Sequence, residues 1–155
     1  MMTQDKHKIP ITILICDDDE DDRMLTQQAL EDAHVSNEVR FVEDGEQLLD
    51  YLYQRGAFAG ETGAAPRPGM ILLDLNMPAM DGREALRLIK QDPTLVDIPI
   101  VVLTTSSLDE DVIRSYRLGV NSFITKPVTF SGLVEAMNVL GRYWLEIVEL
   151  PPQPA

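Results

Sequence analysis

The stretch ITILICDDDEDD, residues 11–22, decides the fold and also poses its main question, because an apolar run turns abruptly into six consecutive acids. The run ITILIC is continuous, rich in β-branched residues and preceded by Pro10, which predicts a buried strand over 11–16. The six acids would repel one another if they were held together without a positive partner. Most acidic runs are solvated loops. The rest of the chain therefore has to show whether these acids surround a positive partner or lie in a solvated loop.

Similar apolar runs recur along the chain and alternate with helical patterns. Their continuity and composition predict four more strands, over 39–42, 70–75, 98–104 and 122–125. Apolar spacing, capping residues and the stops at Pro93, Gly119 and Pro151 predict the helices, over 21–34, 46–53, 82–92, 109–118 and from Ser131 onward. Alternating strands and helices in one domain predict an α/β fold, a five-stranded parallel sheet with helices on both faces.

The chain of 155 residues is expected to form one domain. We expect an N-terminal tail over 1–10, the domain over 11–150 and a short tail over 151–155. Within the domain, the Gly, Ala and Pro content of residues 54–68 predicts an extended loop.

Charge and composition exclude several classes of function. The net charge is −13 and there is no basic cluster, which disfavours binding to nucleic acid and to anionic membranes. No apolar run is long enough to span a bilayer, and no secretory signal is visible. The single cysteine, Cys16, fits a reducing cytoplasm and is expected to be buried, with a thiol pKa raised by neighbouring carboxylates.

The strand ends predict where a site would form. In parallel sheets, sites lie beyond the carboxyl ends of the strands. Asp17 and Asp18 follow the first strand, Asp74 is at the end of the third, Thr104 ends the fourth and Lys126 follows the fifth. The carboxylates suit Mg²⁺, which would allow them to remain ionised together. Asp74 is the acid best placed to act as a nucleophile that forms an acyl phosphate.

These motifs resemble a known family. CDDDEDD, ILLDLNMP, VVLTTSS and FITKP, in this order, look like the receiver domains of two-component response regulators, whose fold is flavodoxin-like, (βα)5, with strand order 2-1-3-4-5. The resemblance implies that Asp74 is the phosphoacceptor and that Asp18, Asp74 and the backbone carbonyl of Asn76 bind Mg²⁺, with Asp17 holding its waters. It further implies that Lys126 is the site lysine, that Thr104 and Phe123 form the conformational switch, and that Pro127 belongs to the family's Lys-Pro pair.

A narrower likeness concerns the segments before the third strand and at the C-terminus. These resemble the single-domain regulators that serve phytochrome-type histidine kinases, which carry a longer loop before strand three and a C-terminal extension, here 143–150. The likeness implies a histidine kinase partner and a homodimer through the helix over 109–118, the strand over 122–125, the following helix and the extension. Trp144 is expected to pack against the sheet or the dimer partner.

The expected function is a stand-alone receiver that takes a phosphoryl group on Asp74 and signals by changed protein binding, and not a turnover enzyme. One alternative is a phosphorelay intermediate or phosphate sink without its own output, and a receiver that never takes phosphate is another. An aspartate-nucleophile phosphatase would need a second acid where Asn76 stands. A flavodoxin-like ligand-binding module would need an uncharged phosphate loop in place of DDDEDD.

Overall fold

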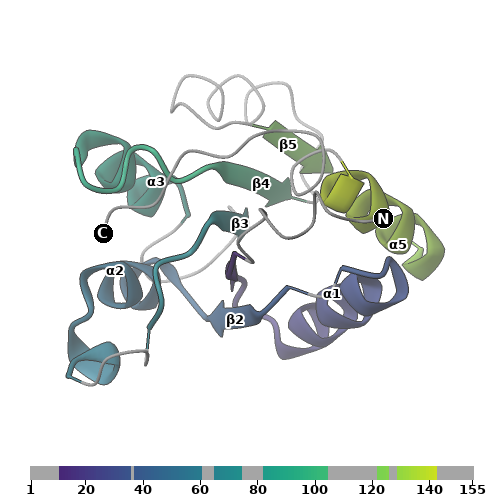
Figure 1. The fold of residues 1–155 in the computed structure, drawn as a ribbon, viewed down its shortest axis with the longest axis horizontal. Helices are drawn as coiled ribbons and strands as arrows, with labels where there is room; N and C mark the ends of the chain where they lie inside the picture. Colours follow the sequence, from purple (N-terminus) through teal and green to yellow (C-terminus); the bar gives the residue numbers. More distant parts are fainter. Residues whose placement is uncertain are drawn as a thin grey trace, which may run out of the picture.

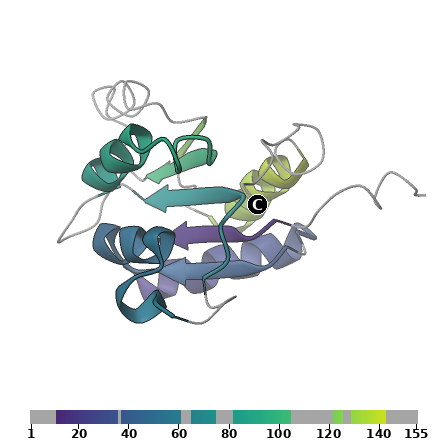
Figure 2. The same cartoon turned by 60° about the vertical axis from the view of Figure 1, so that its left-hand side comes forward.

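A single parallel sheet organises the chain. The computed structural model describes residues 11–35, 37–60, 65–74, 82–104, 122–125 and 129–142. Five strands pair in the order β2-β1-β3-β4-β5, and Figure 2 shows their arrows pointing the same way. Their bounds are β1 Ile13–Cys16, β2 Val39–Val42, β3 Met70–Asp74, β4 Ile100–Thr104 and β5 Ser122–Thr125. The predicted fold class and strand order are confirmed.

The two faces of the sheet are covered by different helices (Figure 1). Successive side chains of a strand point to opposite faces. Leu14 and Cys16 therefore join the apolar cluster beneath α2 (Gly45–Tyr53) and α3 (Gly82–Gln91). Ile13 and Ile15 join the cluster beneath α1 (Glu20–Asp32) and α5 (Phe130–Leu140). β1 and β3 are buried on both faces, which is why they are continuously apolar up to Asp74 and why the sequence pattern identified them, whereas the edge strand β2 is only partly buried.

Two strands begin later than predicted. β1 begins at Ile13, where the pairing with Val39 and Met70 begins, although the apolar run begins at residue 11. β4 begins at Ile100 because Pro99 has no N–H to donate; its carbonyl instead accepts from the amide of Ile71 at 2.9 Å. Hydrophobicity alone therefore overestimated both strands by two residues.

The first helix begins inside the acidic run. Asp19 is the N-cap of α1, and its Oδ1 accepts from the amides of Asp21 and Asp22 at 2.8 and 3.2 Å. The acids that follow lie in the first turn, where the helix dipole favours negative charge. Asp19 therefore caps the helix, and Glu20, Asp21 and Asp22 favour its N-terminus by their charge.

The segment expected to be an extended loop contains a short 3₁₀ helix, η2 (Gly56–Phe58), after α2. The Tyr51 hydroxyl donates to the carbonyl of Pro66 at 2.8 Å, which ties α2 to the chain entering β3. The helix expected over 109–118, the extension over 143–150 and Trp144 lie outside the described residues. In the part of the chain that is described, no helix combines the length and the apolar character needed to cross a membrane.

Candidate metal centre

The carboxyl ends of β1 and β3 bring three acids together. Cys16 pairs with Leu73 across the two strands, so the residues that follow, Asp17 and Asp74, stand at the same level of the sheet edge. One oxygen from each carboxylate of Asp17, Asp18 and Asp74 lies within 4.8 Å of the corresponding oxygens of the other two. Residues far apart in the sequence thus form one cluster because their strands are neighbours.

Asp17 is buried and held by backbone contacts. It is 2% exposed, its amide donates to the carbonyl of Val42 at 3.1 Å, and its Oδ1 accepts from the amide of Asp19 at 3.0 Å. Asp74 is 6% exposed, whereas Asp18 is exposed to solvent. The site is therefore anchored in the sheet by two buried acids and is open to solvent at the third.

The donor set fits a hard divalent cation. Carboxylate oxygens are the ligands that Mg²⁺ prefers, and Mg²⁺ usually retains several waters instead of being enclosed by protein. Three clustered carboxylates with one exposed to solvent match this coordination. A cation among them would also remove their mutual repulsion.

The remaining predicted residues are described only in part. Thr104 is the last residue of β4, one position beyond Leu103, which pairs with Asp74, so its backbone lies at the same sheet edge. Phe123 lies in β5, where it pairs with Val102. Lys126, Asn76 and Pro127 lie outside the described residues, and their predicted roles stay predictions.

Cys16 precedes the acids and is fully buried, as predicted. Its Sγ donates to the carbonyl of Asp44 at 3.4 Å. Burial raises the pKa of this thiol, and the nearby carboxylates of Asp44, Asp17, Asp74 and Asp18 raise it further. The thiol is therefore held neutral and unreactive beside the site.

Arg23 was not predicted to belong to the site, yet its side chain contacts this edge of the sheet. Nη1 donates to the backbone carbonyl of Asp17 at 2.8 Å. The one signal in the sequence is a cation that directly follows six acids. Its partner Asp17, just after β1, could not be identified without the geometry of the first helical turn.

Comparisons with known proteins agree with this geometry. The family model described as "Response regulator receiver domain" matches residues 13–138. Response regulator Rcp1 of a Synechocystis species is 41% identical over 147 residues, covering 95% of this chain and 97% of that protein.

Two solved structures are similar throughout their length. The phosphorylated cyanobacterial phytochrome response regulator RcpA is 42% identical with a TM-score of 0.84, covering 93% of this chain and 100% of that one. The Mn²⁺-bound form of Rcp1 is 41% identical with a TM-score of 0.82, covering 92% of this chain and 100% of that one. Both likenesses therefore extend well beyond the sheet and take in nearly the whole chain.

Proposed function

Because the chain belongs to the response regulator receiver family, we propose that it accepts a phosphoryl group on Asp74 from the phosphohistidine of a partner kinase. The observation that carries the proposal is the grouping of Asp17, Asp18 and Asp74 within 4.8 Å at the carboxyl edge of adjacent strands. A nucleophilic carboxylate at the end of a buried strand, beside two further acids, is suited to metal-assisted phosphoryl transfer.

The metal we propose is Mg²⁺. Asp18, Asp74 and the backbone carbonyl of Asn76 would bind it, and Asp17 would hold its waters, as the family resemblance implies. When bound, the ion neutralises the clustered acids and the charge on the phosphoryl oxygens. The similar Rcp1 structure is a Mn²⁺-bound form, and Mn²⁺ is also a hard cation with a preference for oxygen ligands.

Asp74 carries the covalent step. One carboxylate oxygen donates an electron pair to phosphorus, so that an O–P bond forms while the P–N bond of the phosphohistidine breaks and the imidazole keeps its electrons. The low exposure of Asp74 limits the access of water to the resulting acyl phosphate. Lys126 and Thr104 are proposed to bind the transferred oxygens.

The output is proposed to be a change in protein binding. Thr104 and Phe123 would switch when Asp74 carries phosphate, which biases the surface of the following helices between two states. The proposed partners are a histidine kinase, of the phytochrome type, and a second copy of this chain, in the cytoplasm. The similarity to RcpA supports the choice of kinase, because that regulator is named for a phytochrome.

Intact-mass measurement after incubation with acetyl phosphate and Mg²⁺ tests the proposal. The wild type should gain one labile phosphoryl group, and Asp74→Asn should gain none. Asp97→Asn is a matched control, because Asp97 precedes β4 and lies toward the opposite edge of the sheet. Labelling of Asp74→Asn, or no labelling of the wild type, would refute the proposal.

Three further outcomes separate the alternatives. Continuous turnover of phosphomonoesters would show an aspartate-nucleophile phosphatase instead of a receiver. Size-exclusion chromatography of the wild type and Trp144→Ala tests the homodimer, and an identical monomer in both would exclude it. Phosphoryl transfer onward to a second histidine protein, without a change in oligomeric state, would favour a phosphorelay intermediate.

A further inference from the structure

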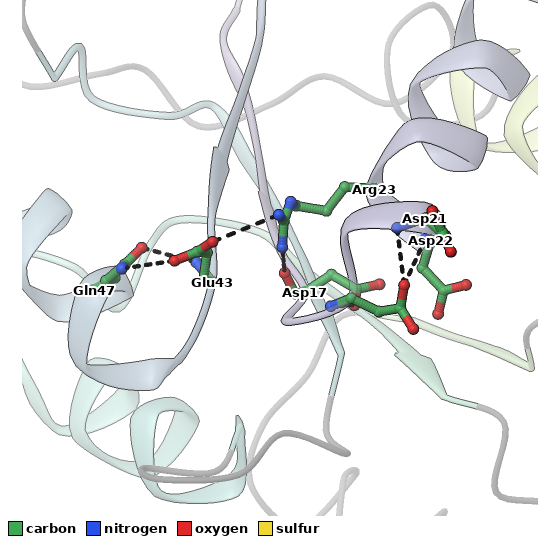
Figure 3. A network of polar contacts seen from close by, with 7 residues as sticks. Asp17, Asp21, Asp22, Arg23, Glu43 and Gln47 are labelled. Carbon is green, nitrogen blue, oxygen red and sulfur yellow. Dashed lines mark hydrogen bonds and ion pairs between the residues drawn. The ribbon is translucent and has the colours of Figure 1, made fainter.

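Arg23 links the exit of β1 to the exit of β2 (Figure 3). It lies in the first turns of α1, and its side chain is only 16% exposed. Nη1 donates to the carbonyl of Asp17 at 2.8 Å, and Nη2 lies 3.5 Å from Oε1 of Glu43. One guanidinium therefore contacts the backbone of a clustered acid and the side chain of a residue on the next strand exit.

The contact continues into α2. Glu43 donates its amide to Oε1 of Gln47 at 3.0 Å, and its Oε2 accepts from Nε2 of Gln47 at 3.2 Å. Gln47 in turn donates its amide to Oδ1 of Asp44, the N-cap of α2, at 2.8 Å. The carboxylate that Arg23 contacts is thus itself hydrogen-bonded to the start of α2.

We infer that Arg23 is a positioning residue of the proposed metal site. The inference rests on the proposed function, since it concerns how the same acids bind Mg²⁺. By holding the carbonyl of Asp17, Arg23 fixes the peptide that joins Asp17 to Asp18, and with it the direction in which both side chains leave the strand. Contacts that orient metal ligands typically change affinity about 10- to 100-fold when removed.

Simple electrostatics predicts the opposite effect for the same residue. A positive guanidinium close to a cation site repels the cation, so removing it should strengthen binding. If Arg23 positions the ligands, removing it should weaken binding despite the gain in negative charge. The sign of the change therefore distinguishes positioning from a mere charge effect.

The experiment is a titration with Mn²⁺, followed by the electron paramagnetic resonance signal of the free ion. We expect the Kd of Arg23→Met to rise about 10-fold relative to the wild type. Arg87→Met is the matched control, since Arg87 pairs with Glu84 on α3 at 2.7 Å and loses the same charge. Its Kd should stay within about twofold of the wild type, because the lost charge is exposed and screened.

Two milder variants distinguish the loss of the Arg23 contacts from a general loss of folded structure. Arg23→Lys keeps the charge but cannot serve two acceptors with the planar geometry of a guanidinium, so an intermediate Kd is expected. Glu43→Gln removes the ion pair and leaves the carbonyl contact, so its Kd should rise less than that of Arg23→Met. Thermal melting in EDTA identifies any variant that is unfolded, and the remaining variants then decide the question.

The outcomes are distinguishable from those of the proposed function. If the wild type and Asp18→Asn bind Mn²⁺ equally, or neither binds it, the metal site itself is wrong. A different result refutes only the role of Arg23: the wild type binds Mn²⁺, Asp18→Asn does not, and Arg23→Met binds the ion as tightly as the wild type or more tightly.

Discussion

Replacement of the buried thiol by Cys16→Ala should remove part of the alkaline destabilisation of the fold. Burial raises the pKa of Cys16 above its ordinary value of 9.0, so above pH 9 the unfolded chain loses this proton while the folded chain keeps it. A group whose pKa is raised by folding contributes stability that is complete below the unfolded pKa and declines as pH rises above it. The wild type therefore loses stability with increasing pH through this residue.

The size of the loss follows from the linkage relation. Each pH unit above 9 removes about 1.4 kcal/mol from the free energy of unfolding, or about 2 kcal/mol between pH 8 and pH 10.5. Burial also raises the pKa of Tyr51, to about 12, which adds a slope of its own above pH 10. That slope is common to the wild type and the variant, so it cancels in the comparison.

The assay is urea denaturation of both proteins at pH 8 and pH 10.5. With an m-value of about 2 kcal/mol/M, the wild type should lose about 1 M more in its midpoint than Cys16→Ala over this range. The smaller side chain lowers the variant's stability at both pH values and does not affect the difference. Equal losses in the two proteins would show that the thiol titrates normally in the folded state, and that the argument from burial is wrong.

Three further predictions concern the metal, a helix cap and a close backbone approach. At a Mg²⁺ concentration 100 times its Kd, the ion should stabilise the fold by about 2.7 kcal/mol in a melting experiment against EDTA, and Asp18→Asn should lose most of this gain. Asp19→Ala removes the acceptor for two backbone amides of α1 and should cost about 1 kcal/mol in urea, with metal absent. Gly69→Ala places a Cβ 2.4 Å from Cβ of Ile11 and should cost about 1–3 kcal/mol. Adding Ile11→Ala should recover part of that loss, because it removes the contacts with Cγ2 and Cδ1 of Ile11 at 2.6 and 2.9 Å, and Ile11→Gly, which also removes Cβ, should relieve the clash fully.

The three central strands could be predicted from sequence because they are buried on both faces, whereas the edge strand β2 is only partly buried. The runs at 39–42 and 122–125 match β2 and β5 without adjustment, and the carboxyl-edge rule then placed Asp17, Asp18 and Asp74 together. The starts of β1 and β4 could not be predicted from hydrophobicity, because they depend on where the partner strands begin and on the missing amide of Pro99.

The bridge through Arg23 was not predictable in the same way. Its two partners belong to different segments, and Glu43 follows β2, twenty residues later in the chain. Only the pairing of β1 with β2 brings these exits together. A sequence pattern reports which residues are buried, but a contact between the start of α1 and the residue after β2 depends on the register between β1 and β2.

The position of β1 between β2 and β3 has a consequence for synthesis on the ribosome. At 5–20 residues per second, roughly 3 to 11 s separate the emergence of Asp18 from that of Asp74. During this interval β1 has its partner on one side only, and its other edge is an apolar template for a foreign strand. The nascent chain therefore exposes this edge to aggregation until residue 70 appears, and throughout that stage the acidic cluster lacks its third carboxylate, Asp74.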